Sequence, residues 1–410
     1  DPLIPKMIWW SVEAHANDRA QVVSWLEQTD FWRSPLAVSA NLTENLMRRY
    51  AMQGRQLDLE TCGELLRLAP DATQTQQLAN GFVKAFSGRS IPSLPDKLIA
   101  ALSKVEGPFA VVLGIRRGDA DSIETALERI VDRSAPRDVR LQYVRAIGEV
   151  KAEAPECISA LLSLLTPEQD EQVITETLVA LQRFDSEEIG VAIIKNYGDL
   201  KPTAQETAVS VLASRATWAS LLIASFQAGD ISPDHISQDT IERLRWHTDP
   251  DLRVQVERQF PARATTSQQL DRRIDLVAEI VRRGNGNPLA GQELFHQKAN
   301  CGKCHQIFGK GGEVGPDLTA YNRSNVRSML LSIINPSAEI RQGYENMTVA
   351  TEDGQVITGF KIDENQKVLV IRSVDGHSHA IEKHSIDEQR PNKLSVMPTG
   401  SLDDLTDDQL

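Results

Sequence analysis

Apolar positions recur with a helical period through most of the first 282 residues. Within residues 122–132 and 155–165, apolar side chains return every three or four positions, which places them on one face of a helix. Short breaks that contain Pro, Gly or Asp separate these segments. The pattern predicts a series of helices joined by short loops.

Some of these helical segments resemble one another. Residues 138–147 align with residues 172–181, and residues 205–212 repeat the second part of that stretch. Offsets of about 30 to 40 residues with two helices per unit are typical of a HEAT-like α-solenoid. A non-repetitive helical bundle is the alternative. We predict a HEAT-like helical repeat domain over residues 1–283.

The pattern changes at residues 284–288, which are rich in glycine, asparagine and proline and predict a linker. A short helix is predicted to follow over residues 289–298. From about residue 344 to about 386, β-branched runs alternate with Asp-Gly turns, which predicts an insert of about four short strands. The predicted fold class is therefore mainly α, with a second domain over residues 284–410 that carries a small β insert.

Composition excludes some classes of function. The formal net charge of −13 opposes binding to the phosphate backbone of nucleic acids. No segment is apolar over the length that crossing a bilayer requires. Four cysteines are too few for a disulfide scaffold in a chain of 410 residues. Cys62 and Cys157 lie in helical patterns and are predicted to be small buried residues.

Cys301, Cys304 and His305 form a Cys-x-x-Cys-His sequence. Two thiols three positions apart lie on one face of a helical turn, so that each can add to a vinyl group of a porphyrin. The adjacent imidazole then projects toward the iron from the same side. This spacing is the attachment motif of c-type haem. We predict one covalently bound haem c, with His305 as an iron ligand.

Two other kinds of site use paired cysteines. A structural zinc site usually needs a second pair of Cys or His ligands, and no cysteine follows Cys304. A thioredoxin-like dithiol requires a strand before the pair within a βαβ unit, whereas residues 291–295 are predicted to be helical. Both alternatives are less favoured than haem.

The residues around the motif resemble the class I cytochromes c. The resemblance rests on Gly291, Phe295, the Cys-x-x-Cys-His sequence and residues 315–318, which read Gly-Pro-Asp-Leu. Cytochromes c of this class normally close with a helix that packs across the first one. Here the chain stops where that helix would begin, and we expect it to be an internal piece of a longer polypeptide.

Residues 289–410 are also similar to the C-terminal haem-binding domain of large multidomain proteins from planctomycetes and verrucomicrobia. In that family a strand-rich insert interrupts the cytochrome c, and helical repeats precede it. A Ser-x-Met-Pro-x-Gly stretch follows the insert, and here it is residues 395–400. A dehydrogenase domain often precedes the repeats in these proteins.

The resemblance implies roles for three residues. His305 would be the proximal ligand, and the carbonyl of Pro316 would accept a hydrogen bond from its imidazole N–H. Met397 would be the distal ligand, and a thioether opposite an imidazole raises the reduction potential. An iron with both axial positions filled transfers electrons and does not activate oxygen.

Other residues are also candidates for the distal position. They are Met329, Met347, His296, His377, His379 and His384. Met329 and Met347 are predicted to pack within a helix and a strand. The histidines of the last hairpin allow ligation by two histidines, but the spacing of His377 and His379 more simply predicts one exposed face. His296 lies on the helix before the cysteines.

The predicted function is electron transfer. We expect the haem to accept electrons from a dehydrogenase domain, in the same polypeptide, and to pass them to an acceptor carrier. Two alternatives remain open: a contribution to a sugar- or alcohol-type dehydrogenase active unit, and a haem-based redox or gas sensor. Whether this chain is itself an enzyme also stays open. The cytochromes it resembles receive haem outside the cytoplasm, which predicts a periplasmic or otherwise extracytoplasmic protein.

Overall fold

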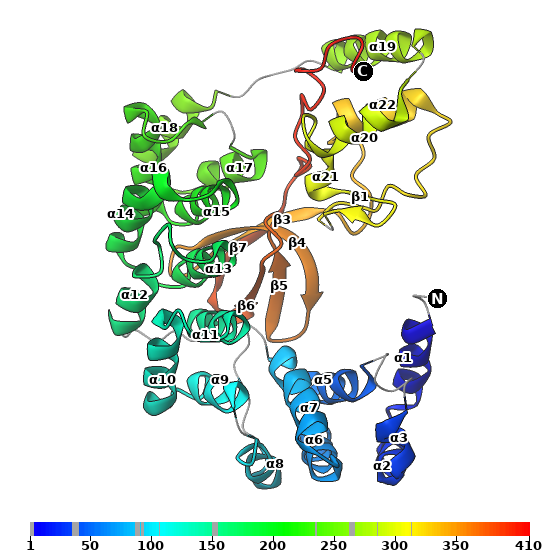
Figure 1. The fold of residues 1–410 in the computed structure, drawn as a ribbon. Helices are drawn as coiled ribbons and strands as arrows, with labels where there is room; N and C mark the ends of the chain where they lie inside the picture. Colours follow the sequence, from blue (N-terminus) through cyan, green and yellow to red (C-terminus); the bar gives the residue numbers. More distant parts are fainter. Residues whose placement is uncertain are drawn as a thin grey trace. The chain divides into compact units, whose positions relative to one another are not determined.

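The computed structural model describes residues 4–34, 41–86, 91, 94–105, 107–149, 155–233, 236–261, 267–284, 286–312 and 314–410. The chain divides into two compact units, Asp1–Phe184 and Asp185–Leu410. The described residues are mostly helical, and a small β region follows the helical part (Figure 1). This confirms the predicted fold class.

The first unit is built from helices. They are α1 (Ile4–His15), α2 (Arg19–Glu27), α3 (Thr29–Arg33), α5 (Leu42–Gln53), α6 (Gln56–Leu68), α7 (Ala72–Ala85), α8 (Asp96–Leu102), α9 (Pro108–Arg116), α10 (Ala120–Val131), α11 (Arg137–Glu149), α12 (Pro155–Leu162) and α13 (Glu171–Leu181). From α5 onward, helices pack against neighbours one or two positions away in the chain, such as α5 on α7 and α11 on α13. Stacked helix pairs produce this kind of packing, so it supports the predicted solenoid. The HEAT-like repeat itself stays a prediction.

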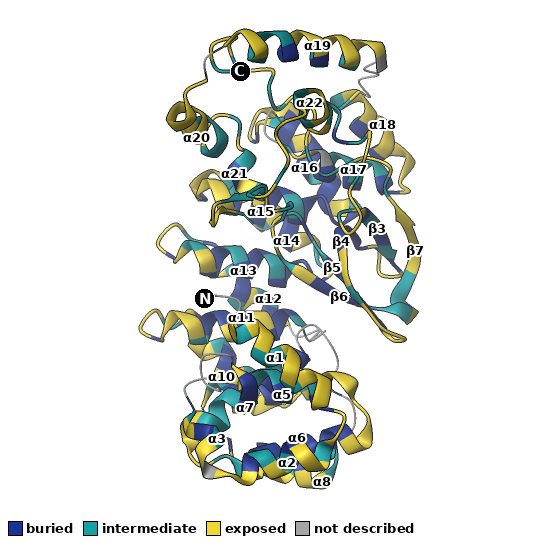
Figure 2. Ribbon diagram, turned by 90° about the vertical axis from the view of Figure 1, so that its right-hand side faces the viewer, coloured by how far each residue is buried: buried dark blue, intermediate teal, exposed yellow. Residues whose placement is uncertain are grey.

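Buried aliphatic and aromatic residues between Ala16 and Leu113 form a hydrophobic core in the first unit. Figure 2 colours buried residues dark blue. Cys62 on α6 and Cys157 on α12 are both fully buried, as predicted. Burial raises the pKa of both thiols. These cysteines are therefore core residues that stay protonated at neutral pH.

The second unit begins with further helices. They are α14 (Glu187–Asn196), the 3₁₀ turn η1 (Tyr197–Asp199), α15 (Pro202–Leu212), α16 (Ala216–Ala228), α17 (Gln238–Trp246), α18 (Pro250–Gln259) and α19 (Ser267–Arg283). The shorter helices α20 (Pro288–His296), α21 (Cys301–Cys304) and α22 (Val326–Ile334) follow, with a two-stranded hairpin of β1 (Gln306–Ile307) and β2 (Lys310–Gly311) after α21.

A five-stranded antiparallel sheet completes the second unit. Its strands are β3 (Asn346–Thr351), β4 (Val356–Glu364), β5 (Val368–Arg372), β6 (Ser378–Glu382) and β7 (Ile386–Pro391), and the 3₁₀ turn η3 (Lys383–Ser385) joins the last two. The strand order is β6-β5-β4-β3-β7, so β7 returns to pair with β3 at the edge of the sheet. The sequence predicted about four strands and missed β7. Almost every residue of β7 is exposed, and its polar side chains do not alternate with apolar ones.

The sheet is attached to the helices through a buried arginine. Arg215, at the start of α16, is 3% exposed, and its Nη1 donates to the carbonyl oxygen of Asp353 at 2.8 Å. Nη2 lies 3.4 Å from the Asp353 carboxylate, and the guanidinium lies over the Trp218 ring. The N–H of Val356 donates to the carbonyl of Ser214 at 2.8 Å. The turn between β3 and β4 is therefore anchored to the loop before α16.

Helix α19 precedes the predicted linker in the chain but packs against elements that follow the linker. Its apolar residues Ile274, Val277 and Ala278 form one core with Leu330 and Ile334 of α22. In addition, Leu402 and Leu410 of the C-terminal segment pack against this core. The residue boundary between the predicted domains, 283/284, stays a prediction, but the packing joins α19 to the elements that follow it.

Replacing Arg215 with alanine is expected to lower the free energy of unfolding of the second unit by about 1.5–3 kcal/mol, because hydrogen bonds between a buried cation and Asp353 are lost. Urea unfolding followed by tryptophan fluorescence measures this change. Arg258→Ala removes an exposed arginine from α18 and serves as the matched control. Equal stability of the two variants would show that the anchor contributes nothing.

Candidate haem site

Local sequence fixes the two short helices around the cysteines. The side chain of Asn287 accepts hydrogen bonds from the N–H groups of Leu289 and Ala290, at 3.0 and 3.3 Å, and Pro288 occupies the first turn of α20. Asn300 adopts a left-handed conformation, with φ of 56°, immediately before α21. The chain therefore turns sharply between the two helices, just before Cys301.

Helix α21 holds the two thiols in one turn. Both cysteines are half-buried, and the N–H of His305 donates to the carbonyl of Cys301 at 2.9 Å. Burial raises the pKa of both the Cys301 and the Cys304 thiol. Reactive dithiols have a lowered pKa instead. The structure therefore disfavours the thioredoxin-like alternative.

After the motif, the described backbone of residues 301–312 and 314–318 closes on itself. The N–H of Gly312 donates to the carbonyl of Gly302 at 2.9 Å, and the N–H of Gly315 donates to Cys304 at 2.8 Å. A third bond, of 2.8 Å, runs from the N–H of Leu318 to Gln306. We call residues 301–312 and 314–318 the ligand loop, because they surround His305.

The ligand loop orients the imidazole of His305. Nδ1 of His305 lies 2.9 Å from the carbonyl oxygen of Pro316, the contact that the cytochrome c resemblance implies. A carbonyl oxygen can only accept, so Nδ1 carries a proton, and in the neutral imidazole the lone pair therefore lies on Nε2. Nε2 is thus left in the form that binds a metal.

A glycine is needed where the loop passes the ring. A Cβ on Gly315 would lie 2.6 Å from Cε1 of His305, so no other residue fits there without displacing the imidazole. The Gly-Pro sequence therefore holds the ring in two ways: Gly315 allows close approach and Pro316 accepts its hydrogen bond.

Two contacts of the motif were not predicted from the sequence. The ring of His296 packs against Gly302, where a Cβ would lie 2.1 Å from Nδ1 of the ring. Lys303 forms an ion pair with Glu206 on α15, and both side chains are about half exposed. Exposed ion pairs contribute about 0–1 kcal/mol. The glycine at position 302 is a sequence signal for the first contact, because it indicates a close approach. The second contact joins residues far apart in sequence and has no such signal.

Met397 lies in the loop that follows β7. It is half-buried, and its N–H donates to Oγ of Ser395 at 3.2 Å. The N–H of Ser395 in turn donates to Oγ of Ser337 at 3.0 Å. These hydrogen bonds position the Met397 loop without linking it to the ligand loop.

The structure also places the other candidates for the distal position. Met347 packs within the sheet core, as predicted, and Met329 is half-buried on α22. His384 is exposed, and its Nε2 lies 3.3 Å from Oε2 of Glu382. The prediction that His379 lies on an exposed face is wrong, because this residue is only 5% exposed. His379 pairs with the fully buried Ile371 of β5, and residues directly opposite share a face of the sheet.

The C-terminal segment forms turns rather than a helix. Residues 399–404 and 407–409 are turns, and Lys298 donates to the side chain of Gln409 at 2.8 Å. Helix α20 has no buried residue and is yellow and teal in Figure 2.

Comparison with known families identifies this region. Residues 289–368 match the family model of cytochrome c. This part of the chain is a cytochrome c domain. It contains both cysteines of the motif, His305 and Pro316, whereas Met397 lies beyond the matched residues. A cytochrome c domain supports haem-based electron transfer and implies covalent haem c.

No curated protein matches the chain. Within the described ranges, no group of three or more His, Cys, Asp or Glu residues is arranged to hold a metal ion. None of the described helices combines the length and the apolar character that crossing a bilayer requires.

Replacing Gly315 with alanine is expected to loosen the ligand loop, because the new Cβ would overlap the His305 ring. Amide hydrogen exchange of the peptide that covers residues 301–318 should become about tenfold faster. Gly286→Ala is the matched control, since no described atom lies within 4 Å of its Cβ position. Unchanged exchange in the Gly315 variant would contradict the role given to this glycine.

Proposed function

We propose that the cytochrome c domain carries one covalent haem c and that its function is one-electron transfer. The orientation of His305 is the observation that supports this most directly. Its Nδ1 is engaged by Pro316 and its Nε2 is left as a ligand, beside two thiols held in a single helical turn. These residues fit the group that the family model implies.

Cys301 and Cys304 attach the haem. The two thiols would hold the haem through thioether bonds to its vinyl groups. His305 provides the proximal ligand, and the Pro316 carbonyl fixes the ring orientation and increases its basicity. When bound, haem supplies a one-electron iron couple.

Met397 provides the distal ligand. The support is its place in a Ser-x-Met-Pro-x-Gly stretch, together with a loop held by Ser395 and Ser337. A thioether ligand at this residue would favour ferrous iron and would exclude gases and substrates.

The electron donor is a dehydrogenase domain of the same polypeptide, and the acceptor is a separate carrier. The support for this arrangement is the similarity to multidomain proteins in which helical repeats precede the haem domain. Haem attachment in such cytochromes takes place outside the cytoplasm, so we assign the protein to the periplasm or another extracytoplasmic space.

Replacing Cys301 or Cys304 with serine tests covalent attachment. The double variant should lose the bound haem mass completely, because both thioether bonds are removed. Each single variant should retain one bond and show an altered absorption spectrum. Mass spectrometry after expression with haem-maturation machinery measures the outcome, and Cys157→Ser, in the first unit, is the control. Full haem mass on the double variant would refute the attachment sites.

Replacing Met397 with alanine tests the distal ligand. The oxidised protein should lose its methionine–iron charge-transfer band, the reduction potential should fall, and the reduced protein should bind carbon monoxide rapidly. Met329→Ala is the matched control, because Met329 is a half-buried methionine on α22. If the Met397 variant keeps the band, another residue is the ligand.

A further inference from the structure

Phe308 occupies the tip of the hairpin between β1 and β2, within the ligand loop. Ile307 pairs with Lys310, so Phe308 and Gly309 form a turn of two residues. The side chain of Phe308 is 76% exposed. An aromatic ring is among the side chains that gain most from burial, so this position leaves unused a contact that a partner could make.

The backbone of Phe308 is also strained. The φ angle is 51° at Phe308 and 75° at Gly309, and a type I′ turn requires such positive values at both central positions. Asn-Gly is the preferred pair for this turn, because a bulky side chain disfavours the left-handed conformation. A single exposed apolar residue needs no special explanation, but one held in a conformation that disfavours it indicates a function.

Hydrogen bonds hold this turn on a fixed backbone. The N–H of Phe308 donates to Oγ1 of Thr319 at 2.8 Å. Thr319 in turn donates from its N–H and its hydroxyl to Oδ1 of Asp317, at 2.7 and 2.5 Å. The hydrogen bonds from Thr319 lower the pKa of Asp317, so this carboxylate stays charged and engaged within the loop. A ring presented on a fixed backbone loses less entropy when it binds.

The segment that carries Phe308 is basic. Residues 294–312 contain Lys298, Lys303 and Lys310 and no acidic residue, in a chain whose formal net charge is −13. All three lysines are exposed, and Lys303 pairs with Glu206. The other two lysines favour a partner with an acidic surface, because complementary charges steer association and suppress wrong partners.

We propose that Phe308 is the central contact of a docking surface for the electron acceptor, a protein with an apolar depression surrounded by acidic side chains. Phe308 fills the depression, and Lys310 pairs with the acidic rim. A few aromatic residues ringed by polar contacts carry most of the binding energy in many interfaces. A lipid surface is less favoured, because stable membrane binding needs more apolar area than one ring provides. The inference rests on the proposed electron-transfer function.

Electron transfer from the reduced, haem-loaded chain to an acidic blue-copper protein tests this surface. One electron leaves the reduced chain and converts Cu(II) to Cu(I) in the acceptor, which stopped-flow absorbance follows. Phe308→Asn should lower the second-order rate constant at least fivefold. This variant should not lower the melting temperature, because Asn-Gly suits a type I′ turn. Its reaction with ferricyanide, a small oxidant that needs no docking surface, should be unchanged.

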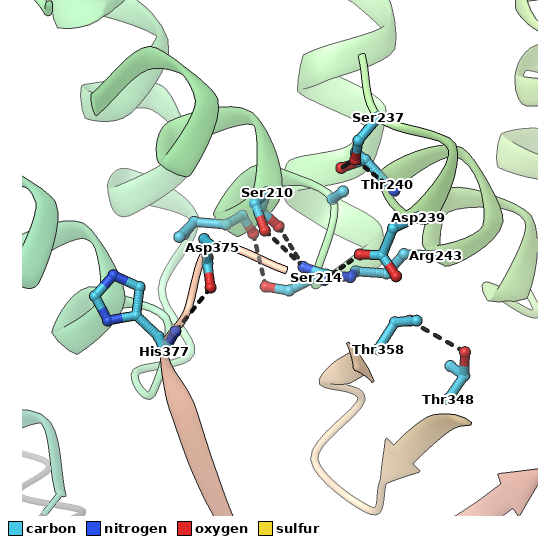
Figure 3. Close-up of polar contacts among 12 residues, drawn as sticks. Ser210, Ser214, Ser237, Asp239, Thr240, Arg243, Thr348, Thr358, Asp375 and His377 are labelled. Atoms are coloured by element: carbon cyan, nitrogen blue, oxygen red, sulfur yellow. Dashed lines mark hydrogen bonds and ion pairs between the residues drawn. The ribbon is translucent and has the colours of Figure 1, made fainter. Parts of the chain in front are cut away.

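Three further variants complete the test. Lys310→Ala should lower the same rate constant about threefold at low ionic strength, and the difference should vanish at high salt. Val254→Asn is the matched control for lost apolar surface, since this valine of α18 is 59% exposed. Ser210→Ala removes a hydroxyl that accepts a hydrogen bond of 3.0 Å from Arg243 (Figure 3). It controls for stability, because it should lower the melting temperature and leave the rate constant unchanged.

Several results would overturn the docking surface. One is an equal rate constant in the wild type and Phe308→Asn, or an equal loss in Val254→Asn. A lower melting temperature of Phe308→Asn would show that the ring stabilises the chain itself. Flotation with phosphatidylglycerol vesicles that depends on Phe308 would assign the ring to a membrane. A wild-type chain that reduces ferricyanide but not the copper protein also contradicts the proposal, whereas failure with ferricyanide would refute the proposed function instead.

Discussion

The hydrogen bond between Nδ1 of His305 and the Pro316 carbonyl is the interaction on which the proposed chemistry depends. It sets the tautomer, and it is possible only because the chain can pass the ring closely at Gly315. Backbone hydrogen bonds from Gly312, Gly315 and Leu318 then close the ligand loop around the motif. The two thiols and the imidazole are therefore arranged by the protein alone.

The haem motif is part of a larger packed unit. The turn between β3 and β4 is anchored by Arg215, and Arg390 on β7 stacks on Trp246 of α17. Helix α19 shares its core with α22 and with the C-terminal Leu402 and Leu410. Helices α16, α17 and α19 are thus each joined to elements that follow the predicted linker.

Local signals in the sequence predicted much of this arrangement. The spacing of Cys301, Cys304 and His305 identifies the motif directly, because attachment chemistry requires neighbouring residues. Helical periodicity predicted the mainly α fold, and Asp-Gly turns located most of the sheet. The edge strand β7 was missed because it is exposed and has little apolar alternation. The burial of His379 was not predicted, because it depends on strand pairing with Ile371. The sequence near these two residues does not indicate that they pair.

Contacts between distant residues could not be predicted in this way. The ion pairs Lys303–Glu206 and Arg215–Asp353 join segments about 100 residues apart or more. The sequence around each of these residues does not indicate which distant residue it pairs with. Similarly, Met397 can act as a ligand only if it lies close to the haem iron in three dimensions. A sequence pattern does not give that distance. Physical reasoning from sequence is therefore strong for the attachment motif and weak for what surrounds it.

The pyridine haemochrome spectrum of the matured protein, quantified per chain, tests the central claim most directly. The proposed function predicts one haem per chain, with the band position of a porphyrin held by two thioether bonds and resistant to extraction by acidified acetone. A colourless protein, or haem that is fully extracted, would contradict the proposed site.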